Sequence, residues 1–207
     1  MADSEAKTHT EVFSSIYAKN AWFAGSGYGS SEAYNRDAYV PFVIGFCLQH
    51  KITSVLDLGS GDWQSAHLIY AHLPSVSYVG VDCVPQVVTA VAARFGSSSP
   101  SRSFQCLDFS QSANVAKLPS ADLVILKDVL QHWPADDIMR FLDALLDEAR
   151  RRGTYPRILV CNCCQQGDGD TGLGCWRQLA ANAWPLNKYG ARPLFRYHTK
   201  EVSLIVP

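Results

Sequence analysis

The sequence of 207 residues has little charge of either sign and no extended basic segment. Charged residues make up 18% of the chain and the formal net charge is −1, so the basic stripe typical of a nucleic-acid-binding surface is missing. The one block of basic residues, 150–152, closes a predicted helix, where positive charge offsets the helix dipole. We therefore expect no nucleic acid among the partners of this protein.

Long apolar runs are absent as well. No stretch reaches membrane-spanning length, and the N-terminal residues Asp3, Glu5 and Lys7 leave no apolar core of a secretion signal. We expect a cytoplasmic protein with no membrane partner. A hydrophobic content of 47% suits one globular domain, 1–207, with N-terminal helices and a loop in 1–50 and a cofactor-binding core in 51–207.

Paired C-x-x-C spacing, which is typical of zinc sites, is also missing. Three of the seven cysteines (Cys161, Cys163 and Cys164) cluster, but in a predicted strand, where free cysteine behaves as a small buried hydrophobe. The polar loop 165–174 has two aspartates but lacks the closing glutamate of a calcium loop, so we interpret it as a loop that faces a substrate. We expect no bound metal.

The segment 54–63, Ser-Val-Leu-Asp-Leu-Gly-Ser-Gly-Asp-Trp, organises the chain. Its apolar run ends in a tight turn at Gly59 and Gly61, and a helical pattern follows at once. This order predicts a buried strand, a glycine turn and a helix. Backbone N–H groups of such a turn point at whatever lies above the strand end, and glycine lets a ligand approach closely.

The residues around the turn favour one of two ligands. The dinucleotide fingerprint G-x-G-x-x-G needs a third glycine, but Gln64 stands there. Asp57 and Asp62 would add two negative charges beside the pyrophosphate of NAD. S-adenosylmethionine (SAM), which carries an ammonium, a sulfonium and no phosphate, suits this turn better.

A second carboxylate position follows the next predicted strand, 77–81. Asp82 could accept hydrogen bonds from both ribose hydroxyls of a cofactor, a contact that NAD-binding folds also use. Alternatively, it caps the helix that opens at Pro85. The near-continuous apolar run 122–126 is typical of a parallel strand buried on both faces.

Polar residues leave this apolar strand where a substrate would lie, because ligands of open parallel sheets sit beyond the carboxyl ends of the strands. Methyl transfer to a hydroxyl requires removal of its proton, and histidine, which titrates near neutrality, is the usual base. We expect His132 to be the general base, with Asp128 either orienting it or binding the substrate. The alternative is that His132 caps a surface helix and Asp128 only holds the loop.

The segment 20–31, Asn-Ala-Trp-Phe-Ala-Gly-Ser-Gly-Tyr-Gly-Ser-Ser, has too many glycines for a stable helix. It is either a flexible connector or a lid over the cofactor, with Trp22 or Tyr28 excluding water. Aromatic residues are unusual in plain linkers, which favours the lid.

Several motifs together resemble class I SAM-dependent methyltransferases. They are Val55-Leu56-Asp57-Leu58-Gly59-Ser60-Gly61, Tyr78-Val79-Gly80-Val81-Asp82, Leu107-Asp108-Phe109 and 121–128, Ala-Asp-Leu-Val-Ile-Leu-Lys-Asp. The resemblance implies an α/β, Rossmann-like fold: a mainly parallel seven-stranded sheet, helices on both faces and a C-terminal antiparallel hairpin. It also implies that Asp108 meets the adenine amino group and that Phe109 lies near the ring; the alternative is that Asp108 is a capping aspartate. In the resembling family an arginine in the region of Arg36 can clasp the SAM carboxylate; the alternative is that Arg36 is an exposed surface residue.

Gly61-Asp62-Trp63 and the segment 127–133, Lys-Asp-Val-Leu-Gln-His-Trp, are similar to small methyltransferases of glycans and sugars. This narrower resemblance implies O-methylation of a small hydroxylated acceptor, most plausibly a sugar. No N-P-P-Y type motif follows the fourth strand, which argues against methylation of nucleic-acid amino groups. The alternatives are another small-molecule acceptor, or a SAM-binding partner protein without catalysis.

The predicted site residues fall into two sets. For the cofactor they are Arg36, Asp57, Gly59, Ser60, Gly61, Asp62, Trp63, Asp82, Cys83, Asp108, Phe109 and Lys127. For the acceptor they are Trp22, Tyr28, Trp133, Asn162 and Trp176, in addition to His132 and Asp128.

Overall fold

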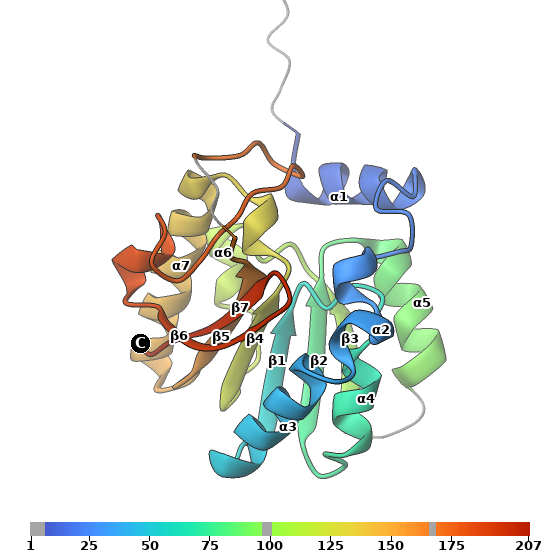
Figure 1. The fold of residues 1–207 in the computed structure, drawn as a ribbon, viewed down its shortest axis with the longest axis vertical. Helices are drawn as coiled ribbons and strands as arrows, with labels where there is room; N and C mark the ends of the chain where they lie inside the picture. The colour runs from blue at the N-terminus through green and yellow to red at the C-terminus, as the bar shows by residue number, and fades with distance from the viewer. Residues whose placement is uncertain (1–6, 97–100, 166–168) are drawn as a thin grey trace, which may run out of the picture.

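A computed structural model describes residues 7–96, 101–165 and 169–207 of the chain and shows an α/β fold built on one seven-stranded sheet (Figure 1). The strand order is β3-β2-β1-β4-β5-β7-β6, and β7 alone runs antiparallel to its neighbours. The sheet is therefore mixed and mostly parallel, as predicted. The strands are β1 Ser54–Leu58, β2 Ser77–Asp82, β3 Arg102–Cys106, β4 Leu123–Lys127, β5 Ile158–Cys163, β6 Arg192–Tyr197 and β7 Lys200–Ile205.

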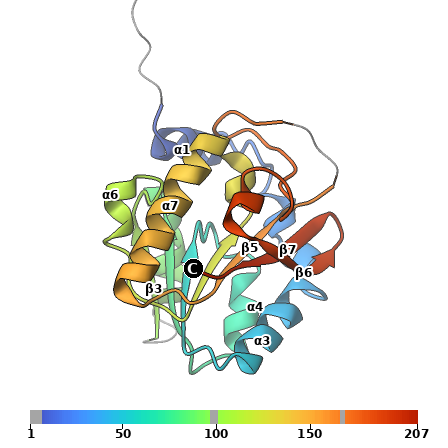
Figure 2. The ribbon, with the colours of Figure 1, turned by 90° about the vertical axis from the view of Figure 1, so that its left-hand side faces the viewer.

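Helices cover both faces of the sheet, and one helix crosses its upper end. Figure 2 shows α7 on one side of the sheet and α3 and α4 on the other. α1 lies above the carboxyl ends of the parallel strands (Figure 1). The α-helices are α1 His9–Ala18, α2 Glu32–Asn35, α3 Tyr39–Gln49, α4 Ala66–Ala71, α5 Pro85–Phe95, α6 Ser112–Val115 and α7 Ala135–Arg152, with short 3-10 helices at Tyr28–Ser30, Leu130–His132 and Leu186–Tyr189.

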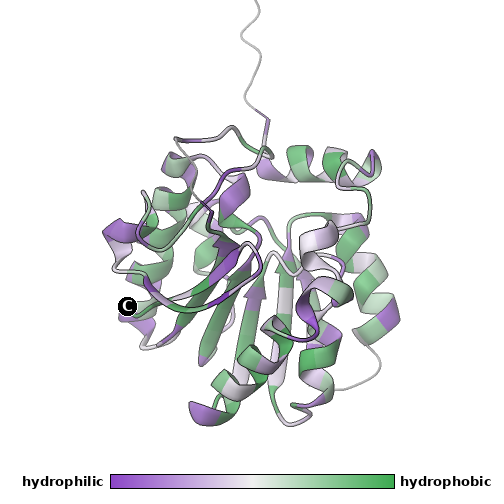
Figure 3. Ribbon diagram, in the orientation of Figure 1, coloured by the Kyte–Doolittle hydropathy of each residue, from purple (hydrophilic) through white to green (hydrophobic). Residues whose placement is uncertain are grey.

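The apolar pattern of the strands explains this layering. Side chains alternate between two buried clusters, so that Leu56 and Leu58 pack toward α7, whereas Val55 packs toward α3 and α4. β4 is buried on both faces. Figure 3 shows hydrophobic residues on the central strands, and helices that carry both hydrophobic and hydrophilic residues. The long amphipathic α7 ends at Gly153, which adopts the left-handed conformation that closes helices.

The apolar residues between positions 32 and 50 predict one helix that Pro41 would kink or split, whereas the structure has two helices there. α2 ends at Asn35, and α3 begins at Tyr39, so that Pro41 falls in its first turn, where a missing N–H costs nothing. Thr8-His9-Thr10-Glu11 predicts a capping box, and α1 begins with one: the Thr8 side chain accepts from the Glu11 N–H, and the Glu11 carboxylate accepts from the Thr8 N–H. Within the described ranges, no helix combines the length and hydropathy needed to cross a bilayer.

Candidate cofactor and active site

The carboxyl ends of β1, β2 and β4 open into a cavity of about 1010 Å³, including the part that is open to solvent. Most of the side chains predicted for the cofactor and the acceptor line it, although they come from segments far apart in the chain. They are Trp22, Asp57, Gly59, Ser60, Gly61, Asp62, Trp63, Asp82, Cys83, Asp108, Phe109, Lys127, Asp128, His132 and Trp133.

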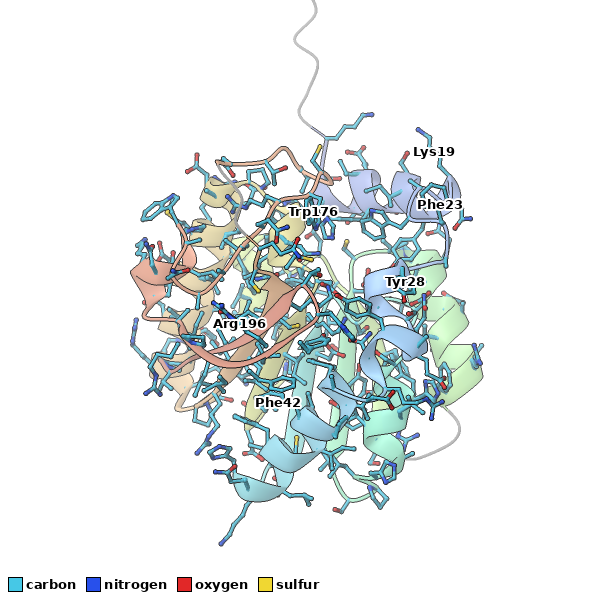
Figure 4. The ribbon with its side chains drawn as sticks, viewed as in Figure 1. Lys19, Phe23, Tyr28, Phe42, Trp176 and Arg196 are labelled. Carbon is cyan, nitrogen blue, oxygen red and sulfur yellow. The ribbon has the colours of Figure 1, made fainter. Side chains whose placement is uncertain are left out.

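Four predicted residues do not line the cavity. Arg36 is on the surface and pairs with Glu32 one helical turn away, so the structure places it away from the cofactor cavity. Tyr28 and Trp176 are 68% and 53% exposed and are labelled at the surface in Figure 4. Asn162 is buried in β5, and neither atom of its amide has a partner in the described part of the chain.

The glycine turn after β1 tolerates no side chain at either glycine. Gly59 and Gly61 have positive φ angles of 77° and 54°. An added Cβ would lie 2.3 Å from Val129 Cγ2 at Gly59, and 2.3 Å from Ser26 Oγ at Gly61. Both positions need glycine because the backbone is left-handed and because neighbouring atoms fill the space.

Asp82, at the end of β2, is held by backbone N–H groups. Its two carboxylate oxygens accept from Gly61 N and Val84 N, each at 3.0 Å. Burial raises the pKa of Asp82, while these hydrogen bonds oppose the rise. α5 receives no side-chain cap, so the capping alternative does not describe this aspartate. The carboxylate is fixed at the cavity wall with lone pairs left for further donors.

Asp57, at the end of β1, depends on a hydrogen-bond chain through the aromatic core. Trp63 Nε1 donates to Tyr78 Oη at 2.8 Å, and Tyr78 Oη donates to Asp57 at 2.7 Å. Trp63 is 2% exposed, so its indole supports the site from within the core. Burial raises the pKa of Asp57 to about 6, although the Tyr78 bond and the charge of Lys127 act against it.

Asp62 ties the segment 20–31 to the glycine turn. Ser26 N donates to Asp62 Oδ2 at 3.1 Å, and Asp62 N donates to Ser26 Oγ at 3.0 Å. Gln64 bridges Asp62 and the carbonyl of Ala24, each at 2.8 Å. Asp62 Oδ1 faces no described partner and is buried. These contacts favour the lid over the linker, because the segment is fastened to the cavity wall.

Asp128 lies between two lysines. Lys127 Nζ donates to its Oδ2 at 2.6 Å, and Lys200 Nζ donates to its Oδ1. Burial would raise the pKa of Asp128, but the two positive charges outweigh it and lower that pKa. Lys127 also donates to the carbonyl of Gly29 at 3.0 Å, which fastens the lid a second time.

His132 is oriented by neighbours other than Asp128. The carbonyl of Cys175 lies 2.8 Å from His132 Nδ1, and a carbonyl can only accept, so Nδ1 carries the proton. Gln131 accepts from Cys163 N through its Oε1, which turns its Nε2 toward His132 Nε2 at 3.3 Å. Burial lowers the pKa of His132, so the imidazole is neutral at pH 7, with its lone pair on Nε2.

Sequence reasoning missed α1 and Lys200 as parts of the site. His9, Phe13 and Tyr17 of α1 line the cavity, but the sequence shows only the apolar face of a helix there. Lys200 is 2% exposed although it stands in what the sequence suggests is a hairpin turn. His9 of α1 contacts Asp137, and Lys200 contacts Asp128, in each case across more than 60 residues of the chain. The local sequence contains no pattern that would predict such contacts. In the described ranges, no three His, Cys, Asp or Glu residues group as a metal site would require.

Comparison with known families defines the class. Residues 43–176 match the O-methyltransferase domain family over more than half of the chain, and the chain belongs to that family. The proteins of this family use SAM. Curated proteins gave no significant match.

Solved structures of methyltransferases share the fold. Human N-acetylserotonin methyltransferase in complex with SAM is 19% identical with a TM-score of 0.61, and the match covers 97% of this chain and 60% of that one. CalO1, a methyltransferase in calicheamicin biosynthesis in its SAH-bound form, is 20% identical with a TM-score of 0.56, covering 97% and 69%. PigF with SAH is 12% identical with a TM-score of 0.66, covering 99% and 64%. The chain thus spans about 60% of the length of the human enzyme.

The residues present fit SAM. The buried Asp62 Oδ1, which has no partner among the described residues, and the fixed carboxylate of Asp82 offer acceptors for its ammonium and ribose hydroxyls. Lys127, the lysine that lines the cavity among the described residues, is already paired with Asp128 and so offers no free positive charge to a pyrophosphate.

Proposed function

We propose that this protein transfers a methyl group from SAM to a hydroxyl of a small acceptor, with His132 as general base. The observation that carries the proposal is the position of a neutral, oriented imidazole in the same cavity as the glycine turn. SAM supplies the electrophilic methyl when bound, so the protein's tasks are to align the two reactants and to remove the hydroxyl proton.

His132 can take that proton at Nε2. Its Nδ1–H is held by the Cys175 carbonyl at 2.8 Å, which fixes the ring and leaves the lone pair on the other nitrogen. The contact from Gln131 to Nε2 is 3.3 Å long, which an acceptor hydroxyl can replace. Asp128 is paired with its two lysines, and we propose that it holds the lid and the substrate side of the cavity rather than the imidazole.

For the acceptor we propose a sugar or glycan hydroxyl, on the resemblance of 61–63 and 127–133 to the glycan enzymes. Aromatic side chains near the base support a ring-shaped acceptor: Trp22 lies with its ring centroid 5.1 Å from that of His132. The exposed Trp176 follows Cys175 directly and offers a second flat surface. Asn162 is a further candidate contact because its amide has no described partner.

A phenolic acceptor is the second candidate. The same aromatic surfaces suit a planar ring, and the human relative described above is named for N-acetylserotonin. We therefore propose small molecules as the partners of this protein. That the acceptor is a glycan, that the protein is cytoplasmic and that residues 1–207 form one domain are predictions from the sequence.

The test is a paired acceptor screen with SAM, in which SAH formation is measured with sugars and with phenols. His132→Ala should lower turnover on any active acceptor by about 100-fold or more, while SAH affinity stays within about twofold of wild type. Retained turnover would refute the role of His132. Binding of SAH with no turnover on any acceptor would favour a non-catalytic SAM-binding protein.

A further inference from the structure

His9, the first residue of α1, carries the cavity's clearest unused hydrogen-bonding atom. It is 6% exposed and lines the cavity, and its Nδ1 is buried without a hydrogen-bond partner among the described residues. A buried polar atom without a partner is uncommon in native proteins and needs an explanation.

Asp137 sets the chemical character of this atom. His9 Nε2 lies 2.8 Å from Asp137 Oδ2, across 128 residues of sequence. An ionised carboxylate only accepts hydrogen bonds, so the proton of the neutral imidazole is on Nε2 and the lone pair is on Nδ1. Arg140 pairs with the other oxygen of Asp137. His9 therefore presents a hydrogen-bond acceptor to the cavity.

The surroundings of His9 indicate which part of the cavity it serves. Its ring meets Trp133 edge-on, with centroids 4.5 Å apart, and Trp133 in turn stacks on Phe109 at 5.7 Å. The neighbouring Thr10 donates to Asp108 Oδ2 at 3.5 Å. The first turn of α1 thus covers the end of β3, where Asp108 and Phe109 follow the strand.

Asp108 has one oxygen available for a ligand. Its Oδ1 accepts from both Ser110 N at 3.1 Å and Ser110 Oγ at 2.5 Å. Within the described part of the chain, its Oδ2 has only the long contact from Thr10. Two acceptors, His9 Nδ1 and Asp108 Oδ2, therefore border a compartment with the aromatic walls Phe109 and Trp133.

We propose that His9 is a cofactor-binding residue, whose Nδ1 accepts one hydrogen of the adenine amino group while Asp108 accepts the other. An exocyclic amino group has two donor hydrogens, which matches two acceptors, and the aromatic walls suit a flat base. The proposal rests on the proposed function in that SAM is taken to lie with its adenine at the end of β3. It makes α1 part of the cofactor site, held to α7 through Asp137.

The test compares SAH with S-inosyl-L-homocysteine, in which an oxygen acceptor replaces the amino group. Wild-type protein should bind SAH about 100-fold more tightly in calorimetric titrations, because two protein acceptors would face the acceptor oxygen of the analogue. His9→Phe keeps a ring against Trp133 but removes the lone pair. It should lower that preference about tenfold, mainly by weakening SAH binding. His72→Phe, an exposed position outside the cavity, is the matched control and should leave the preference unchanged.

The ratio of two dissociation constants is insensitive to a general loss of stability, so a destabilised variant still gives an answer. His9→Gln, which restores a side-chain acceptor, should recover part of the preference. An unchanged preference in His9→Phe would overturn the proposal, and so would a loss of methyl transfer with unchanged binding of both ligands, which would mark His9 as a base. If wild-type protein bound neither ligand, the cofactor assignment itself would fail, which is a separate outcome.

Discussion

Three buried carboxylates at strand ends are each balanced by a different kind of neighbour. Asp57 receives a tyrosine hydroxyl, Asp82 receives backbone N–H groups, and Asp128 is paired with two lysines. Burial raises the pKa of the first two, whereas the two positive charges reverse that effect at Asp128. The three residues therefore differ in how they affect stability.

The raised pKa of Asp57 predicts that the ionised carboxylate lowers the free energy of unfolding in a pH-dependent way. Its pKa rises from 3.8 to about 6 in the folded protein, so the native state holds the proton more tightly, and stability is lost as the pH rises through that window. A shift of about two units corresponds to about 3 kcal/mol. We therefore expect the free energy of unfolding of Asp57→Asn, minus that of wild type, to rise by about 3 kcal/mol as the pH is raised from about 3.5 to about 7. Urea unfolding of the apo protein at each pH measures this difference.

A difference between the two proteins that is constant across this pH range would contradict the account of Asp57. Tyr78→Phe is the matched control. It removes the hydroxyl that supports the ionised carboxylate, so it should enlarge the penalty above pH 6 rather than abolish it.

For Asp128 we expect the same substitution, aspartate to asparagine, to destabilise the protein. Asp128→Asn leaves Lys127 and Lys200 close together without a counter-charge, and removing one partner of a buried ionic cluster typically costs about 3 kcal/mol or more. Lys200→Met leaves the pair of Lys127 and Asp128 intact and should cost less. Free energies of unfolding at about pH 7 in which Lys200→Met is the more damaging of the two would show that Asp128 is not the centre of the cluster.

How far single residues could be predicted depends on the range of their contacts. Gly59, Gly61 and Asp82 follow from a local motif, because a strand, a turn and a helix are contiguous in sequence. Ser26, which holds Asp62, and Lys200, which holds Asp128, are 36 and 72 residues away from their partners. Arg36 pairs with Glu32, one helical turn away, on the surface, which is the second of the two positions that its sequence context left open.

At the scale of elements, the segment 20–31, which we propose to be a lid, is held at several points although its regular structure in the described residues is a short 3-10 helix. Gly25 has a positive φ of 57°, and an added Cβ would lie 1.9 Å from Asp62 Oδ2. Tyr17 of α1 adds a contact to Ser26 at 2.6 Å. The lid is therefore held from the helix before it and from the glycine turn below it.

Gly25→Ala should push the lid away from Asp62, because the added Cβ and the carboxylate of Asp62 cannot occupy the same space. The hydrogen bond from Ser26 to Asp62 would then be lost, and we expect SAH binding to weaken by about tenfold or more. Gly45→Ala is the control: a Cβ there meets nothing within 4 Å, and alanine in the middle of α3 should stabilise the protein by about 0.5–1 kcal/mol. SAH affinity by calorimetry and thermal unfolding separate the two effects. Wild-type affinity in Gly25→Ala would show that the lid does not govern cofactor binding.

Elements with a strong period were the easiest to predict. The helix ending at Gly153 and the strands β4 and β5 carry apolar patterns that match their burial. The segment 32–50 was predicted as one helix that Pro41 would kink or split, and the break falls before Pro41, where Ala38 leaves the helical conformation. Proline is tolerated in a first turn, so its position alone did not locate the break.

At the scale of the whole molecule, the strand order brings Asp57, Asp82 and Asp128 to one edge of the sheet. Because the glycine turn lies at the same end of the sheet, one cavity is lined both by residues predicted for the cofactor and by residues predicted for the acceptor. The order of strands could be expected only from the resemblance to class I methyltransferases. The position of α1 over the cavity could not be expected from that resemblance. The apolar face of a helix predicts that the face is buried, but not which part of the molecule it packs against.

The most direct test of the account is calorimetric titration of the wild-type protein with SAH and, separately, with NAD. We predict one SAH bound per chain, no heat of binding with NAD, and a weakening of SAH binding by about tenfold or more in Asp82→Ala, which removes the carboxylate at the end of β2. Binding of NAD with no detectable binding of SAH would contradict the account.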